Sequence, residues 1–265
     1  MRVAILGGGS CFAMNLAWHY LRDDCDVFSI SRSPMREQAF TFDIEYEKRF
    51  QYLTAHLVSE LPLVMSVLDD FKPHTIVNFA ALCEVGLSWE HAPDYYETNV
   101  TALVRLVQEL ADRLYLKCFV QIGSSEVYGS VAEPATEDAP INPSSPYAVS
   151  KAAFDAHLRA ICRHQQFPGV IVMPSNGYCQ GQTLNRIIPK AIICALTGSK
   201  LQLQGGGMAR KSYLHADDIS SAIMLVERIG TRGETYNCGP EGSTAIRDLV
   251  SLIANKFGKE LSDIA

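Results

Sequence analysis

The sequence predicts an α/β protein built on a doubly wound parallel sheet. Short apolar runs typical of buried strands alternate with helical patterns over most of the 265 residues. The composition, 48% hydrophobic and 20% charged, allows a chain of this length to bury a substantial core. Alternating strands and helices form β-α-β units with right-handed crossovers, and the sheet is then covered on both faces.

The elements are expected in a regular order. The predicted strands are short and apolar, at 3–6, 27–30, 52–55, 75–79, 119–122 and 170–173. The predicted helices follow them at 12–22, 61–71, 95–114 and 147–164, with one more near the end at 244–257. After about Pro174 the elements become shorter and richer in glycine and polar residues, so we expect a main domain at 1–173 and a smaller, interleaved lobe at 174–265.

Composition excludes several classes of protein. A net charge of -6 and a pI near 5.6 argue against nucleic acid as a partner. No apolar run has the ~18 residues of a membrane span, and the opening MRVAILGGG enters a strand pattern without a signal peptide. The eight cysteines show no C-x-x-C pair or metal-ligand spacing, so we expect buried thiols, a cytoplasmic protein and no metal site.

A glycine-rich loop follows the first predicted strand. Gly7, Ser10 and Ala13 stand three apart, which is a degenerate form of a G-x-x-G-x-x-G pattern. Glycines there let the backbone turn tightly and approach a pyrophosphate, whose charge meets the N-terminus of the next helix. The loop therefore predicts a dinucleotide site.

The end of the second predicted strand bears on which dinucleotide is bound. A carboxylate at that point would bind a free ribose 2′-hydroxyl, but the chain has Ser31 and Arg32 there. Because a guanidinium suits a 2′-phosphate, NADP is favoured over NAD. The alternative is that Arg32 is an ordinary solvated charge.

Two further segments carry candidate catalytic groups. Ser124, Ser125 and Glu126 follow a predicted strand, at the edge where parallel sheets place their sites. Tyr147 and Lys151 are four residues apart at a helix start and share a face, where the ammonium is expected to lower the pKa of the phenol and make it a base. A turn of small residues after another strand, Asn78-Phe79-Ala80-Ala81, is suited to pass beneath a cofactor.

Taken together, these motifs resemble the extended short-chain dehydrogenase/reductases, specifically the NAD(P)-dependent epimerase/dehydratase family acting on nucleotide sugars. The resemblance covers nearly the whole chain and includes the further segments YYETNV from Tyr95, PSNGY from Pro174, SYLHADD from Ser212 and TYNCG from Thr235. It implies a Rossmann fold with a small, shortened C-terminal substrate lobe, whose pocket is more open, completed by a partner or closed around a smaller substrate. It also implies a homodimer through a four-helix bundle, with Leu103, Leu106, Leu110, Ala152, Phe154 and Leu158 at the interface unless they pack on their own sheet.

The resemblance also implies roles for individual residues. Ser124 and Tyr147 would hold the sugar 4-hydroxyl, Lys151 would bind the nicotinamide ribose, and Asn99 would help orient Lys151. The implied cofactor-binding set is Gly7, Gly9, Ser10, Cys11, Phe12, Ser31, Arg32, His56, Leu57, Phe79, Ala80, Ala81, Asn99, Tyr147, Lys151 and Pro174. Asp43-Ile44 competes with His56-Leu57 for the adenine position, and the implied substrate-binding set is Glu84, Asn176, Arg210 and Lys211.

Glu126 bears on the reaction within this family. A 4,6-dehydratase must remove the proton at C5 after C4 is oxidised, and a carboxylate beside the serine suits that base role, with Ser125 next to it. The Ser-Ser-Glu string resembles GDP-mannose-type 4,6-dehydratases, whereas the dTDP-glucose type would have an aspartic acid at Ser125. The alternatives are a nucleotide-sugar 4-epimerase or 4-ketosugar reductase and a non-catalytic NADP(H) sensor. Separately, Glu126 has a structural alternative, a carboxylate held by backbone N–H groups at the turn. Decarboxylases that make UDP-xylose share the Ser-Glu pair.

Overall fold

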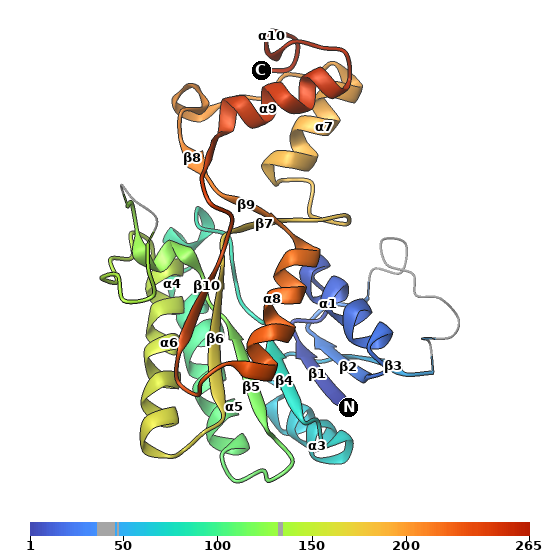
Figure 1. The fold of residues 1–265 in the computed structure, drawn as a ribbon, viewed down its shortest axis with the longest axis vertical. Coiled ribbons are helices and arrows are strands. Elements are labelled where there is room, and N and C mark those ends of the chain that lie inside the picture. Colours follow the sequence, from blue (N-terminus) through green and yellow to red (C-terminus); the bar gives the residue numbers. More distant parts are fainter. Residues whose placement is uncertain (36–45, 47, 132–134) are drawn as a thin grey trace.

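The computed structural model describes residues 1–35, 46, 48–131 and 135–265. Its centre is a seven-stranded sheet with the strand order β10-β6-β5-β4-β1-β2-β3, in which every neighbouring pair is parallel (Figure 1). The strands are β1 (Arg2–Leu6), β2 (Asp26–Ser31), β3 (Phe50–Thr54), β4 (Thr75–Asn78), β5 (Cys118–Ile122), β6 (Gly169–Pro174) and β10 (Thr235–Cys238). The predicted fold class is confirmed.

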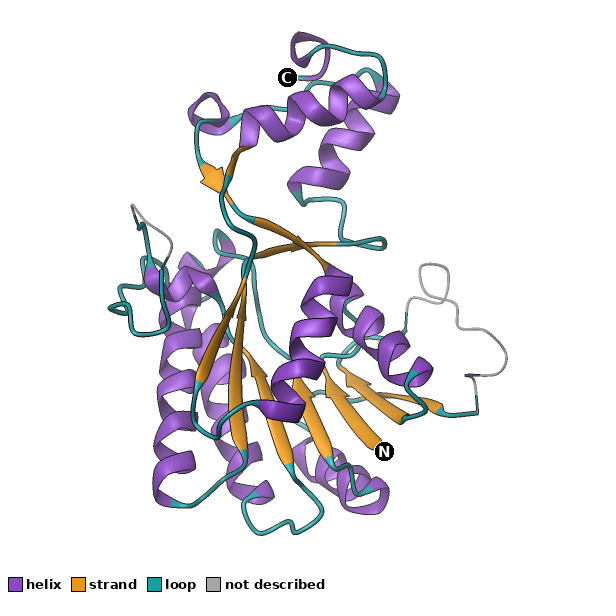
Figure 2. Cartoon of the chain, in the orientation of Figure 1, coloured by secondary structure: helices purple, strands orange, loops and turns teal. Residues whose placement is uncertain are grey.

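Helices cover both faces of this sheet (Figure 2). One face carries α3 (Leu61–Phe71), α5 (Ala102–Leu110) and α6 (Pro146–His164), and the other carries α1 (Cys11–Arg22) and α8 (Ala216–Ile229). Because side chains alternate along a strand, β1 sends Ala4 and Leu6 into the first core and Val3 and Ile5 into the second. Burial on both faces explains why the strands read as unbroken apolar runs.

The helix expected at 95–114 is interrupted, which corrects the sequence prediction. It is α4 (Ala92–Tyr96), a π-helical turn η2 (Glu97–Thr101) and then α5. Pro93 in the first turn allows the earlier start, and the π-turn adds a residue at Asn99, whose side chain is buried and hydrogen-bonded to neighbouring elements. Short 3-10 turns complete this half of the chain: η1 (Leu87–Trp89) and η3 (Ser125–Tyr128).

The later part of the chain builds a second, smaller core beyond the carboxyl ends of the strands (Figure 1). The helices α7 (Ile187–Thr197), α9 (Ile246–Lys256) and α10 (Leu261–Ile264) pack together there, next to the turn η4 (Gln204–Gly207). Two small sheets connect this lobe to the main body: β7 (Asn176–Tyr178) beside β9 (Tyr213–His215), and β8 (Arg210–Lys211) beside β11 (Thr244–Ala245). The helix expected from residue 244 therefore starts at Ile246, because Thr244 and Ala245 pair with β8.

The chain passes repeatedly between the two bodies. It leaves the main sheet at Pro174, returns at Ala216 to form α8, and completes the sheet with β10 beside β6 before leaving again. Residues after 174 therefore supply one covering helix and one edge strand of the main body.

The apolar residues expected at a dimer interface lie inside the chain's own core. Leu103, Leu106, Leu110, Phe154 and Leu158 are each at most 1% exposed, and Ala152 packs against the same cluster. Their burial against the sheet corrects the expectation that they face a second subunit. Within the described residues, no helix has both the length and the apolar character needed to cross a membrane.

Candidate active site

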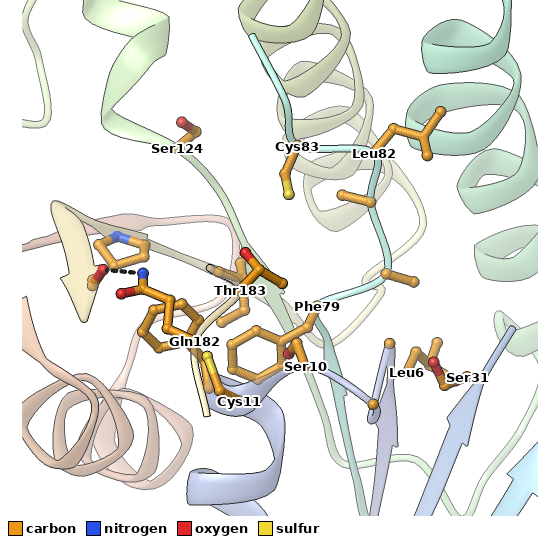
Figure 3. A pocket seen from close by; sticks show the side chains of 18 of the residues that line it. Leu6, Ser10, Cys11, Ser31, Phe79, Leu82, Cys83, Ser124, Gln182 and Thr183 are labelled. Atoms are coloured by element: carbon orange, nitrogen blue, oxygen red, sulfur yellow. Dashed lines mark hydrogen bonds between the residues drawn. The ribbon is translucent and has the colours of Figure 1, made fainter. Parts of the chain in front are cut away.

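A cavity of about 880 Å³ lies at the carboxyl ends of β1, β4 and β5, beneath the C-terminal lobe. This is the edge where the strand order reverses between β1 and β4, and open α/β sheets bind ligands at such a point. Figure 3 shows Ser10, Phe79 and Ser124 from three strand ends around the same space.

The glycine-rich loop forms the floor of this cavity. Gly7 has φ +73, and a Cβ at that position would lie 2.6 Å from the backbone nitrogen of Ala80, so only glycine lets the two loops approach so closely. Ser10 caps α1, because its hydroxyl accepts a hydrogen bond from the Ala13 nitrogen at 3.2 Å. All of the expected residues of this loop line the cavity: Gly7, Gly9, Ser10, Cys11 and Phe12. The three glycines leave the backbone open to a ligand, and the loop leads into the N-terminus of α1. Both features suit the diphosphate of a dinucleotide.

The expected adenosine end is formed by β2 and the loop after β3. Ser31, Arg32, His56 and Leu57 line the cavity, and Arg32 and His56 also border an adjoining hollow of about 460 Å³. The competing pair Asp43-Ile44 lies outside the described residues. On the opposite wall, Phe79, Ala80, Ala81 and Pro174 line the cavity as expected.

Tyr147 and Lys151 reach the cavity from the first turns of α6. The ring of Tyr147 packs edge-on against that of Tyr95, with centroids 6.4 Å apart and an interplanar angle of 80°. Burial raises the pKa of Tyr147 above its ordinary value, and the neighbouring Ser124 side chain opposes this shift. Lys151 is also buried, its pKa is lowered by burial, and its ammonium donates to the Ile122 carbonyl at 2.6 Å. In the protein without cofactor the net direction is therefore opposite to the expected lowering, because burial of the phenol dominates.

Asn99 acts on α6 without lining the cavity. Its Nδ2 donates to the Leu82 carbonyl and to the Ser150 hydroxyl, both at 3.0 Å, and its Oδ1 accepts from the Leu82 nitrogen at 2.8 Å. Ser150 directly precedes Lys151, so Asn99 fixes the helix turn that carries the lysine rather than contacting the ammonium.

Glu126 occupies the cavity wall on η3. Ser124 caps this turn, since its hydroxyl accepts from the Glu126 nitrogen at 3.3 Å. The Glu126 carboxylate accepts a hydrogen bond from Lys211 Nζ at 2.8 Å. The alternative in which backbone N–H groups hold this carboxylate is therefore wrong, because its partner in the structure is a lysine of the C-terminal lobe. Ser125 lines the cavity beside it.

The expected substrate-binding residues are only partly brought together. Asn176 lines the cavity, and its Nδ2 donates to the Ser212 carbonyl at 3.4 Å. Arg210 instead contacts the hydroxyl of Ser243 at 3.0 Å and the carbonyl of the same residue. Glu84 is exposed and accepts from Asn185 at 3.1 Å. Of the four expected residues, Glu84, Arg210 and Lys211 are not among those that line the cavity.

One wall was missed by sequence reasoning. The segment before and into α7 closes the cavity from the lobe side, with Gln182, Thr183, Asn185, Arg186, Ile187 and Ile188. In Figure 3, Gln182 and Thr183 lie in the same space as Cys83 and Phe79. No motif or periodicity marks this segment, and its polar residues are read from sequence as a simple loop.

The His215 and Asp217 pair, which superficially suggests a metal, has a structural role. His215 caps α8 and accepts from the Asp217 nitrogen at 3.3 Å. Among the residues that the structure describes, no three histidine, cysteine or acidic side chains come together as a metal ion would require.

Comparison with known proteins agrees with this geometry. The model of the NAD dependent epimerase/dehydratase family matches residues 3–239. The dTDP-glucose 4,6-dehydratase of Haemophilus influenzae is 28% identical over 250 residues, covering 89% of this chain and 73% of that protein.

Solved structures are similar over the whole chain. The dTDP-glucose 4,6-dehydratase of Bacillus anthracis in complex with NAD has a TM-score of 0.86 at 28% identity, covering 100% of this chain and 84% of the other. The dTDP-glucose 4,6-dehydratase of Streptomyces venezuelae with NAD bound has a TM-score of 0.89 at 26% identity, with the same coverage.

Proposed function

Because the chain belongs to the NAD dependent epimerase/dehydratase family, we propose that it is a nucleotide-sugar 4,6-dehydratase that oxidises C4 of its sugar with NAD(P). The observation that carries this proposal is that Ser124, Glu126, Tyr147 and Lys151 line the same cavity as the glycine-rich loop. The dehydratases among the relatives support the same reaction.

The residues of the chain divide the work of the reaction between them. A nicotinamide held by the glycine-rich loop and Lys151 would supply the redox chemistry, as acceptor and later donor of a hydride. Tyr147 takes the proton of the 4-hydroxyl, and Ser124 beside it holds that hydroxyl in place. Lys151 binds the ribose of the cofactor, and its positive charge favours the phenolate form of Tyr147 at the moment of transfer.

Glu126 acts in the second step. Once C4 is a ketone, the C5 proton becomes acidic, and the Glu126 carboxylate accepts it. The protonated Glu126 then gives a proton to the departing 6-hydroxyl, which leaves as water, and C5 regains a proton from solvent when C6 is reduced. Ser125 lies beside Glu126 on the same wall and can orient that hydroxyl. We propose this role for Glu126 because a 4-epimerase needs no base at that position.

The direct test is to incubate the purified protein with dTDP-glucose, UDP-glucose and GDP-mannose in the presence of NAD or NADP. The Ser-Ser-Glu string resembles the GDP-mannose type, whereas the Haemophilus and Bacillus relatives are named for dTDP-glucose and a plant relative for UDP-glucose, so all three sugars belong in the panel. A 4-keto-6-deoxy product from one of them is expected. Absence of water loss from every sugar would contradict the proposal.

Glu126→Gln separates the dehydratase from the second candidate, a 4-epimerase or 4-ketosugar reductase. A dehydratase variant should lose exchange of the C5 proton with deuterated solvent while C4 oxidation persists. An epimerase should be little affected. The third candidate, a non-catalytic NADP(H) sensor, would be supported if Tyr147→Phe kept full biological activity.

For the cofactor, we propose a preference for NADP. β2 ends without a carboxylate, and Arg32 lines the cavity at that end and can pair with a 2′-phosphate. NAD is bound in the related Bacillus and Streptomyces structures. The test is therefore the ratio of the dissociation constants of this protein for NAD and NADP. Arg32→Ser should shift that ratio toward NAD, and equal binding of both cofactors by the native protein would contradict the preference.

We also propose that the lobe after Pro174 binds the nucleotide sugar and that the protein is a homodimer. Asn176 and the segment leading into α7 line the cavity from the lobe side, which supports the first point. Tyr96 and Val149 on α4 and α6 are apolar and each 38% exposed, which supports helices as the contact surface. Light scattering of the native protein and of Val149→Glu checks this: the native mass should be twice that of one chain and the variant mass lower.

A further inference from the structure

An ion pair links the candidate base to the C-terminal lobe. Lys211 Nζ lies 2.8 Å from Glu126 Oε1, and the two side chains are 40% and 32% exposed. Both groups are therefore in contact with solvent, and pairs of this kind are weak because water and ions compete for each partner. Lys211 can therefore leave Glu126 for a more strongly charged partner with little loss of stability of the folded protein.

The two basic residues of β8 differ in what they contact. Successive side chains of a strand point to opposite sides, and Arg210 points to Ser243, where it bonds the hydroxyl and the carbonyl. Lys211 points the other way, to Glu126, and its backbone is fixed by the pairing of β8 with β11. Lys211 is therefore the lobe cation presented to the catalytic wall.

The ion pair has a consequence for the base. The Glu126 oxygen that accepts from the ammonium at 2.8 Å is occupied by that contact and is not open to a substrate proton. The substrate of the proposed reaction has a diphosphate, which bears more negative charge than a carboxylate and binds ammonium groups well.

We propose that Lys211 is a positioning residue that exchanges Glu126 for the diphosphate of an entering nucleotide sugar. Without substrate, Lys211 holds the Glu126 carboxylate. When the diphosphate binds, Lys211 pairs with it, and the carboxylate is released to accept a proton. The carboxylate is then free of Lys211 only when a nucleotide sugar is present. This inference rests on the proposed function for the identity of the substrate.

Calorimetric binding of a nucleoside diphosphate tests the exchange without requiring turnover. The probes are dTDP, UDP and GDP, titrated into the native protein, Glu126→Gln, Lys211→Met and the double variant. If Lys211 must leave Glu126 to bind the diphosphate, Glu126→Gln binds it about twofold to fivefold more tightly, as expected from the strength of an exposed ion pair. In the Lys211→Met background the same change has no effect.

Other outcomes contradict the exchange. Equal tightening by Glu126→Gln in both backgrounds would mean a general charge effect, and no tightening in the native background would mean that the pair does not compete with the ligand. Failure of all three diphosphates to bind would also overturn it. The proposed function is tested by a different measurement, the formation of the 4-keto product. The exchange at Lys211 and the proposed function can therefore be contradicted independently.

Two further variants guard against a loss of folding. Lys211→Arg keeps the charge and should keep the coupling to Glu126→Gln. Arg210→Met removes the neighbouring cation and should leave that coupling unchanged, because Arg210 is bonded to Ser243. Melting temperatures of all variants, measured without ligand, identify any that are partly unfolded.

Discussion

Asp155 follows Lys151 by one helical turn on α6, and the two residues are 1% and 3% exposed. Burial raises the pKa of Asp155 to about 6, and the charges of Lys151 and Arg159 only partly offset it. The Gln121 side chain also opposes the shift. A buried carboxyl therefore lies one helical turn from Lys151 and holds its proton in the folded state at mildly acid pH.

The pH dependence of stability should reveal this carboxyl. Between about pH 4 and pH 6 the unfolded chain releases the Asp155 proton while the folded chain keeps it, so this group makes the protein less stable as pH rises. Relative to Asp155→Asn, the native free energy of unfolding should fall by on the order of 3 kcal/mol across that window. Urea denaturation at pH 4, 5, 6 and 7 measures the difference.

Asp69→Asn is the control of opposite sign. The Asp69 carboxylate accepts from Arg113 at 2.8 Å and 3.0 Å, and this interaction lowers the pKa of the carboxyl. The ionised Asp69 carboxylate stabilises the folded protein above the ordinary pKa of an aspartate, and this stabilisation is lost as pH falls. Parallel stability curves for the native protein and Asp155→Asn would contradict the assignment of the buried proton.

Gly7→Ala should destabilise the protein and abolish cofactor binding. The new methyl group would lie 2.6 Å from the Ala80 nitrogen, so either loop must move. Gly198 is a matched control, because it also has φ +73 but nothing within 4 Å of a new Cβ. Gly198→Ala should lose only about 1 kcal/mol from backbone strain and keep native cofactor affinity. Equal effects of the two substitutions would mean that close approach of the loops is unimportant.

Tyr147→Phe should lower kcat about 10²-fold to 10⁴-fold, because the hydroxyl that takes the substrate proton is removed while the ring contact with Tyr95 remains. Stopped-flow measurement of C4 oxidation checks this. Tyr20→Phe is the control: the Tyr20 hydroxyl is buried with no partner among the described residues, so its loss should leave kcat unchanged and stability equal or higher.

Asn99→Ala should cost about 2–4 kcal/mol in unfolding free energy, because it leaves the Ser150 hydroxyl and the Leu82 backbone groups without their partner. Asn185→Ala removes an exposed amide that bonds Glu84 and should stay within about 0.5 kcal/mol of the native value. Chemical denaturation distinguishes the two. A neutral Asn99→Ala would mean that water replaces all of these bonds.

The main sheet was predictable from sequence, because each central strand is a short apolar run bounded by turns. The helix Leu61–Phe71 was also predicted with its observed ends, since Pro62 in its first turn and Pro73 after its last residue mark them. The π-turn at Asn99 was not predicted. It depends on hydrogen bonds to Leu82 and Ser150, which are distant in sequence and leave no local pattern.

The candidate site was predicted less evenly. Residues at strand ends, such as Ser124 and Gly7, line the cavity because the topology itself brings those ends together. The directions of Arg210 and Lys211 depend on how β8 pairs with β11, and two adjacent cations in a sequence do not indicate which one contacts Glu126. The pKa of Tyr147 depends mainly on how deeply its phenol is buried. The four-residue spacing between Tyr147 and Lys151 gives no information about that burial.

The path of the chain between its two bodies sets how they can move. The chain enters or leaves the lobe next to β6, α8 and β10 (Figure 1). The lobe is therefore joined to the main body by several chain crossings rather than by a single linker. A protease cut at any one of these crossings would leave the others intact, so the fragments should stay associated under native conditions. Opening and closing over the cavity must then be a small tilt in which all crossings bend together.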